Sequence, residues 1–192
     1  VVRHVFSADA DGTAVVVMAL ADAGCLRRHI KARQAAFPER DVLFIFLQLC
    51  LALDHVHGMG MLHRGLKTSN VLLTATGLVM LSDFAFFAGQ HADCRSAPEQ
   101  WRAEAYTAKS EVWALGVVLY EIMALKRPFG GKNMDELIDN IVHARYDPLP
   151  DHYSPDLRNV VTQLLQLEPS QRPSLRQMFL QPFIRNHGLA TL

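Results

Sequence analysis

Hydrophobic and polar positions divide the chain into a leading strand pair and a mostly helical remainder. Apolar residues dominate 1–7 and 14–20, and the turn between them, residues 9–12, ends in Asp-Gly, a dipeptide typical of tight hairpin turns. Shorter apolar pieces at 71–74 and 78–81 flank a second polar turn. The patterns therefore predict two β-hairpins, one at the start of the chain and one before its middle.

Helical periodicity accounts for most of the other segments. The 39–58 segment is apolar on nearly every side, so we expect a buried helix that ends at Gly58. Ser154 followed by Pro155 is a typical helix start, and Ser174 is a second candidate N-cap. The expected helices span residues 25–35, 39–58, 110–125, 133–143, 155–167 and 174–181.

Composition favours a globular domain and gives no sign of a polyanionic or lipid partner. Half of the 192 residues are apolar, and 19 basic residues balance 19 acidic ones, so the formal net charge is zero. A nucleic-acid or membrane-surface binder would carry a basic excess. The most apolar run, 42–53, is shorter than the roughly 20 residues that span a bilayer. We therefore expect no nucleic-acid partner and no membrane.

The cysteines indicate a reducing compartment. Cys25, Cys50 and Cys94 fit no zinc-binding spacing, and an odd number cannot form a closed disulfide framework. Cys50 lies in the apolar 39–58 helix, where packing is the simplest role for it. A reducing environment, and hence a cytoplasmic location, is the expectation that follows.

Five short motifs occur in order along the chain. They are Leu62-His63-Arg64-Gly65-Leu66-Lys67-Thr68-Ser69-Asn70, Ser82-Asp83-Phe84-Ala85, Ala97-Pro98-Glu99, Glu111-Val112-Trp113-Ala114-Leu115-Gly116 and Arg172-Pro173. In that order they resemble the catalytic loop, the magnesium motif, the Ala-Pro-Glu motif, the start of the central helix and the conserved arginine of eukaryotic protein kinases. Each is weak alone, but the ordered set covers nearly the whole chain. Residues 113–121 and 153–158 are most similar to the NIMA-related serine/threonine kinases.

The resemblance implies an α+β, protein-kinase-like fold. The chain would form mainly the helical C-terminal lobe, with a hairpin left from the fourth and fifth strands of the upper lobe. Residues 1–22 would be partial upper-lobe strands and the hinge, 23–187 the C-terminal lobe and 188–192 a tail. The sequence contains no Gly-rich phosphate loop and no Val-Ala-x-Lys strand. Whether a longer parent chain supplies them stays open.

The resemblance also assigns the catalytic positions, and one of them is changed. Gly65 stands where the family has the aspartate that accepts the substrate hydroxyl proton, a form of assistance worth about 10²–10⁴-fold in rate. Lys67 matches the lysine that contacts the transferring phosphate. Asn70 and Asp83 match the magnesium ligands, and their hard oxygen atoms suit that ion. The implied cofactors are Mg²⁺ and ATP if the chain is active, and none otherwise.

Alignment with the family also places the nucleotide base. Met18 falls at the gatekeeper position, and Ala19, Leu20 and Ala21 fall at the adenine hinge. Leu72 falls at the floor of the adenine pocket. Without an upper sheet, a nucleotide on these residues would lack its roof and its phosphate-binding lysine.

Three structural pairs are expected from the same resemblance. His63 and Phe84 should stack in the core, and Glu99 should form a buried ion pair with Arg172. Glu111 replaces the aspartate that anchors the catalytic-loop backbone, and its extra methylene should leave that anchor partly preserved.

The activation segment, residues 83–99, departs from the family in several ways. It is short, and it lacks the Gly-Thr-x-x-Tyr platform on which peptide substrates dock. Ala85 replaces the glycine of the magnesium motif, which is a mild loss. Ser96 is the only candidate phosphorylation site in the segment. Arg64, which in the family pairs with a phosphate on this segment, is therefore expected to lack that partner.

Three functional hypotheses follow. The first is a pseudokinase, inactive because of Gly65, that binds or regulates a protein partner. The second is a weak or divergent serine/threonine kinase with a protein substrate, whose upper lobe lies outside this chain. The third is a degenerate product whose strand remnant exposes an edge and apolar residues such as Val15 and Val17. The identity of the partner and the oligomeric state do not follow from the sequence.

Overall fold

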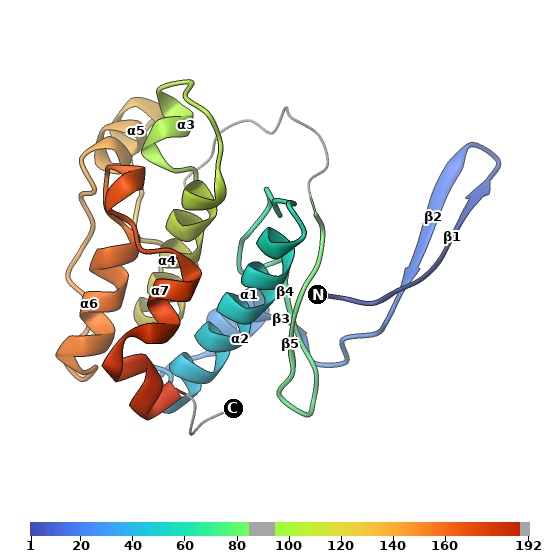
Figure 1. Ribbon diagram of the computed structural model, residues 1–192, viewed down its shortest axis with the longest axis horizontal. Helices are drawn as coiled ribbons and strands as arrows, with labels where there is room; N and C mark the ends of the chain where they lie inside the picture. Colours follow the sequence, from blue (N-terminus) through green and yellow to red (C-terminus); the bar gives the residue numbers. More distant parts are fainter. Residues whose placement is uncertain (85–94, 189–192) are drawn as a thin grey trace.

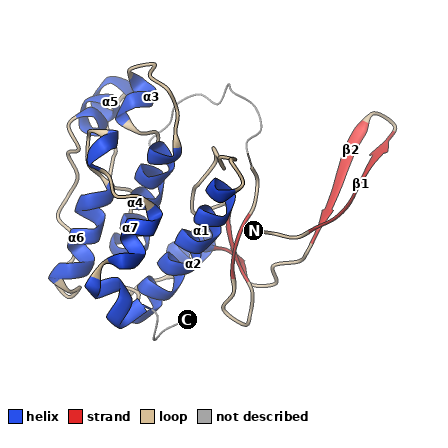
Figure 2. Ribbon diagram, in the orientation of Figure 1, coloured by secondary structure: helices blue, strands red, loops and turns tan. Residues whose placement is uncertain are grey.

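The computed structural model describes residues 1–84 and 95–188, with a helical body from which one β-hairpin projects (Figure 1). Its strands are β1 (His4–Ala10), β2 (Thr13–Met18), β3 (Gly24–Cys25), β4 (Val71–Leu73) and β5 (Val79–Leu81). Its helices are α1 (Leu26–Ala32), α2 (Glu39–Gly58), α3 (Pro98–Trp101), α4 (Ala108–Ala124), α5 (Met134–Val142), α6 (Pro155–Leu164) and α7 (Leu175–Leu180). A 3₁₀ turn, η1 (Pro169–Gln171), and a π turn, η2 (Ile184–Gly188), complete the described elements. Helices and strands occupy opposite sides of the molecule (Figure 2), which confirms the predicted α+β class.

The first hairpin turns at Asp11-Gly12, as the sequence predicted. Both residues have positive φ, 54° and 77°, which is the geometry of a type I′ turn. The first strand was predicted over 1–7 but is observed as His4–Ala10, because the antiparallel pairing continues up to the turn with Ala10 opposite Thr13. The hairpin carries several exposed apolar side chains: Val5, Phe6, Val15, Val16 and Met18. Val17 on the same strand is half-buried.

The second sheet joins three short antiparallel strands in the order β3-β4-β5. Gly24 lies opposite Leu73, and Val71 lies opposite Leu81. Strand β3 was not predicted, because a two-residue strand leaves no alternation to detect. The backbone N–H of Val2 donates to Leu81 O at 2.8 Å, so the start of the chain is tied to the end of this sheet.

Helix α2 lies in the core. By length and composition alone it is apolar enough to cross a membrane, although half of its most apolar window is buried inside the fold. It contacts β5, α4, α7 and η2, so its apolar faces have protein partners. Cys50 is 1 % exposed, which confirms its packing role. Burial of this helix was correctly predicted from its pattern.

Helix α4 is the central element, and its residues from Ser110 to Met123 are all buried. The Thr107 hydroxyl accepts from the N–H of Lys109 and caps its start. A Cβ at Gly116 would lie 2.8 Å from the Leu164 Cβ, so only glycine allows α4 and α6 to approach this closely. The glycine of the Trp-Ala-Leu-Gly motif is therefore a packing requirement.

Two helices are shorter than predicted, and the difference has local causes. The first helix was predicted over 25–35 but is observed as Leu26–Ala32, because Cys25 pairs in β3 at one end and the backbone becomes extended at Arg33 at the other. The 155–167 helix ends at Leu164, because the following backbone carbonyls turn toward Arg172. Helix α3, of only four residues, was missed. The Ser154 cap was correct, since its hydroxyl accepts from the N–H of Leu157.

Candidate functional site

The loop after α2 and the end of β5 bring three predicted site residues together. Asn70 Nδ2 donates to the carbonyl of Gly65 at 2.9 Å, and the N–H of Ser82 donates to the carbonyl of Asn70 at 2.9 Å. The Ser82 hydroxyl also donates to Asp83 Oδ2 at 3.2 Å. Gly65, Asn70 and Asp83 therefore form one cluster, as their assignment to a single site requires.

Gly65 is closely surrounded. A Cβ built on it would lie 3.1 Å from the Asp83 carbonyl oxygen, 3.5 Å from Asn70 Nδ2 and 3.7 Å from His63 Cε1. None of these three nearest atoms is a carboxylate oxygen. The shortest contact would force the Asp83 carbonyl to move by a few tenths of an ångström. The loop is thus packed around a residue without a side chain.

The backbone on either side of this cluster adopts a rare conformation. Arg64 and Asp83 have φ values of 59° and 57°, in the left-handed region that non-glycine residues seldom adopt. Such residues typically cost about 1–3 kcal/mol and persist where surrounding contacts hold them. For Arg64 one such contact is visible, because its N–H donates to Glu111 Oε1 at 2.5 Å.

Glu111 anchors the loop, which confirms the expected role of this substituted residue. It is fully buried, and besides the N–H of Arg64 its carboxylate contacts His57 Nε2 at 2.6 Å and the Tyr106 hydroxyl at 3.2 Å. Burial and the Glu111 carboxylate raise the pKa of Tyr106 above its ordinary value, so this phenol stays a donor. No motif or periodicity pointed to His57 or Tyr106.

His63 and Phe84 are in contact as predicted, with ring centroids 4.4 Å apart, but the rings are tilted by 37° instead of stacked, and Phe84 is only half-buried. Burial lowers the pKa of His63 below its ordinary value, despite the opposing influence of Glu111. His63 Nδ1 accepts from the N–H of Gly65 at 3.1 Å, which requires an unprotonated nitrogen there. The histidine is therefore a neutral packing residue that also supports the loop backbone.

Asn70 and Asp83 fit a magnesium–nucleotide complex better than a metal site made by protein alone. The Asp83 side chain is exposed, while Asn70 is 7 % exposed and is held by its bond to Gly65. Within residues 1–84 and 95–188, no group of three His, Cys, Asp or Glu side chains could hold a metal. Mg²⁺ commonly takes one or two carboxylates and completes its shell with phosphate and water oxygens, and it neutralises charge on the phosphates. Lys67 lies in the same loop, where its carbonyl accepts from the N–H of Asn70.

The residues assigned to the adenine pocket are only partly brought together. The Ala21 carbonyl accepts from the N–H of Gly24, so the end of the hinge adjoins β3 and, through it, Leu72 on β4. The N–H of Ala19 donates to the carbonyl of Arg3. Leu20 is 84 % exposed and Met18 is 44 % exposed, so the described part of the chain does not enclose them.

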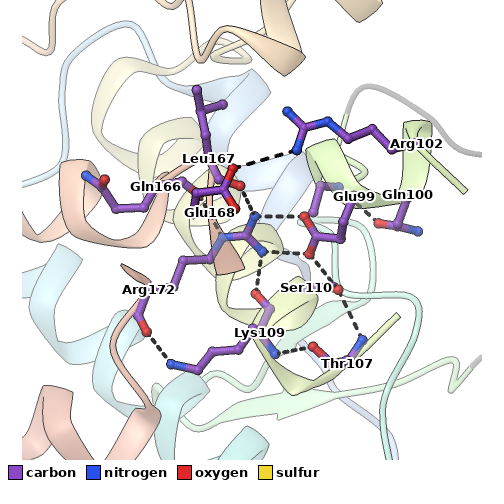
Figure 3. A network of polar contacts seen from close by, with 11 residues as sticks. Glu99, Gln100, Arg102, Thr107, Lys109, Ser110, Gln166, Leu167, Glu168 and Arg172 are labelled. Carbon is purple, nitrogen blue, oxygen red and sulfur yellow. Dashed lines mark hydrogen bonds and ion pairs between the residues drawn. The ribbon is translucent and has the colours of Figure 1, made fainter. Parts of the chain in front are cut away.

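Glu99 and Arg172 form the predicted buried ion pair (Figure 3). Two N–H···O bonds of 2.7 and 2.8 Å join them, and the Ser110 hydroxyl donates to Glu99 Oε1 at 2.7 Å. The other guanidinium donors bond the carbonyls of Lys109, Gln166 and Leu167, so all five N–H groups are used. Burial alone would raise the pKa of Glu99, but the Arg172 and Ser110 hydrogen bonds outweigh it and hold the pKa below its ordinary value.

Several sequence predictions fall outside the described residues. These are the assignment of Ala85, the pairing state of Cys94, the central part of the activation segment and the end of the C-terminal tail. Arg64 was expected to lack a phosphate partner, and its guanidinium carbon lies 5.7 Å from the centroid of the Tyr106 ring. This distance is within the range of a cation–π contact.

Comparisons with known proteins agree with the motif assignment. A family model described as the protein kinase domain matches residues 1–184. The putative serine/threonine-protein kinase A of Trypanosoma brucei brucei is 42 % identical over an alignment 207 positions long, which covers 98 % of this chain and 48 % of the relative. Serine/threonine-protein kinase Nek4 of Mus musculus is 35 % identical, and the alignment covers 92 % of this chain and 24 % of Nek4. Nek1 of the same species is 36 % identical, and the alignment covers 96 % of this chain and 16 % of Nek1. The chain thus spans about half the length of the trypanosome relative and less of the Nek kinases.

Proposed function

The chain belongs to the protein kinase family and is related to the Nek and trypanosome serine/threonine kinases, and on that premise we propose that it is a pseudokinase. It has a kinase C-terminal lobe that does not transfer phosphate at a useful rate. It acts as a regulatory module that binds a protein partner. A cytoplasmic location is part of the proposal and is supported by the free thiols of Cys25 and Cys50. Fractionation of cells that places the protein in an oxidising compartment would count against that location.

Gly65 is the observation that carries the proposal. Phosphoryl transfer depends on positioning and charge stabilisation, and the catalytic-loop aspartate positions the hydroxyl nucleophile and accepts its proton. At Gly65 there is no side chain, and the nearest atoms to its absent Cβ are a carbonyl oxygen, an amide nitrogen and a ring carbon. The loss of general-base assistance alone corresponds to a rate decrease of about 10²–10⁴-fold.

Turnover measurements test the proposal. The purified protein is incubated with Mg²⁺, labelled ATP and a panel of generic protein substrates, next to an active Nek kinase as a positive control. We expect incorporation at the level of a no-enzyme blank. Robust turnover that co-purifies with the protein through two chromatographic steps would overturn the proposal.

A second candidate, a weak divergent serine/threonine kinase, is favoured by the cluster of Asn70 and Asp83. The polar groups expected to hold Mg²⁺ and phosphate are retained, and the Asn70 amide is fixed by its bond to Gly65. This function predicts that Mg²⁺ with ATP raises the melting temperature of the protein and that Asp83→Asn abolishes the rise. If neither ATP nor Mg²⁺ shifts the melting temperature, this second function is excluded.

A further inference from the structure

We propose that a basic cavity beside the 62–70 loop binds an acidic segment of a partner protein. The cavity lies among α1, the loop residue Thr68 and the end of α4, and its volume is about 270 Å³. This inference rests on the proposed function, because it names the chemical class of partner that the module would bind.

Positive charge dominates the walls of this cavity. Five of its nine lining residues are basic, and they come from three separate parts of the chain: Arg27, Lys31, Arg95, Lys126 and Arg127. Lys126 Nζ is 2.6 Å from the exposed Asp147 carboxylate, so that charge is largely neutralised. Among the described residues, no ion pair includes Arg27, Lys31 or Arg127. These three cations face a shared concave surface whose single acidic lining residue is Glu121.

Hydrogen bonds hold the floor of the cavity, where one buried acceptor has no partner among the described residues. The N–H of Arg27 donates to the carbonyl of Thr68 at 2.9 Å, and the Thr68 hydroxyl donates to Glu121 Oε2 at 2.7 Å. Glu121 is 7 % exposed, and its Oε1 is buried without a hydrogen-bond partner in the described part of the chain. Buried acceptors are normally bonded, so this atom indicates that a donor from a ligand completes the site.

The two features together define the ligand. An acidic peptide supplies carboxylates for Arg27, Lys31 and Arg127, and its own backbone N–H groups are donors for Glu121 Oε1. Consecutive residues of an extended peptide are about 3.3–3.6 Å apart, so one short segment presents both kinds of group within such a cavity. A fully deprotonated inorganic anion such as sulfate would meet the Glu121 carboxylate without offering a donor. An extended polyanion such as a nucleic acid would require a longer basic surface than one cavity in a chain of zero net charge.

Fluorescence anisotropy without nucleotide tests the inference. The probe is a labelled 12-residue peptide of alternating Asp, Glu and Gly, titrated with the full chain at low ionic strength. Lys31 and Arg127 are exposed, so the double variant Lys31→Glu/Arg127→Glu should fold. We expect it to bind at least about tenfold more weakly, since the introduced glutamates carry the same sign of charge as the peptide and repel it. The control Arg40→Glu/Lys132→Glu changes the net charge by the same amount, at exposed positions outside the cavity lining. Its dissociation constant for the peptide should stay within about twofold of the wild-type value.

Several results would overturn this inference. They are equal binding by the cavity variant and its control, preference for an arginine-rich peptide of the same length, and displacement of the probe by equimolar inorganic phosphate or single-stranded oligonucleotide. The outcome is independent of the turnover assay. If the protein phosphorylates substrates yet binds the acidic peptide, the pseudokinase proposal fails and the cavity assignment stands. If it neither transfers phosphate nor binds the peptide, only the cavity assignment fails.

Discussion

The Arg172 guanidinium meets the Glu99 carboxylate through two hydrogen bonds of 2.7 and 2.8 Å across 73 residues of sequence. Both side chains are buried, and the guanidinium carbon also lies 5.1 Å from the ring centroid of Trp113. The pair joins α3 to the segment before α7 and to the central helix α4. It is therefore a structural connection between distant elements, set apart from the cluster around Gly65.

Replacing Glu99 by glutamine should destabilise the fold strongly. Loss of the carboxylate leaves the Arg172 guanidinium buried without an opposing charge, which typically costs about 3–5 kcal/mol. Urea unfolding followed by circular dichroism measures the change. As a control, Arg145→Gln removes an exposed ion pair with Asp139 and should cost less than about 1 kcal/mol. Similar losses in the two variants would contradict the assigned role.

Stability should fall as the pH decreases below 6.5, partly because of His63. Burial lowers the folded-state pKa of His63 below the ordinary 6.5, so between these two pKa values the unfolded chain binds a proton that the folded chain does not. The stabilisation is fully present above 6.5 and is lost as the pH falls toward the folded-state pKa. In urea titrations at several pH values, His63→Phe should reduce the decline of the unfolding free energy with falling pH. Substitution of the exposed His55 by glutamine should leave that decline unchanged. Identical slopes for His63→Phe and wild type would exclude this explanation.

Removing the Glu111 carboxylate should loosen the 62–70 loop. Glu111→Ala leaves the N–H of Arg64 and the His57 ring without their acceptor, at about 1–3 kcal/mol for each unsatisfied group. Tyr106→Phe removes only the third contact to the same carboxylate and should cost about 1 kcal/mol. Denaturant unfolding and amide hydrogen exchange of the loop measure both effects. The anchor would be refuted if Glu111→Ala were no worse than Tyr106→Phe.

Alanine at position 65 should destabilise the protein, whereas alanine at position 58 should not. The Gly65 Cβ would meet the Asp83 carbonyl oxygen at 3.1 Å, while a Cβ on Gly58 meets nothing within 4 Å. We expect a loss of about 1 kcal/mol for Gly65→Ala from crowding. Gly58→Ala, at the last residue of α2, should instead stabilise by about 0.5–1 kcal/mol through lower chain entropy. Effects of the same sign would contradict the close packing around Gly65.

Sequence reasoning was strongest where one residue type has few physical alternatives. The Asp-Gly turn, the Ser154 cap, the buried α2 pattern and the Glu99–Arg172 pair all follow from local geometry or from an ordered motif, and the structure confirms each. The grouping of Gly65, Asn70 and Asp83 in one site likewise follows from the ordered motifs. Their catalytic and ligand roles stay predictions, because proximity alone does not assign chemistry.

The features that sequence reasoning missed depend on tertiary contacts between distant residues. His57 reaches Glu111 across 54 positions, and Thr68 reaches Glu121 across 53, with no motif to link either pair. The end of α6 was misplaced because the carbonyls of Gln166 and Leu167 bond Arg172 instead of continuing the helix. Strand β3 and helix α3 are too short for a periodic signal.

The most direct test of the missing catalytic base is the rate of phosphate transfer from Mg²⁺–ATP by wild type, Asp83→Asn and Gly65→Asp proteins, measured side by side on one substrate. Wild type and Asp83→Asn should be indistinguishable, and Gly65→Asp should be faster by about 10²–10⁴-fold once the Asp83 carbonyl has shifted to admit the new side chain. Wild-type turnover that is lost in Asp83→Asn and not increased by Gly65→Asp would contradict this expectation.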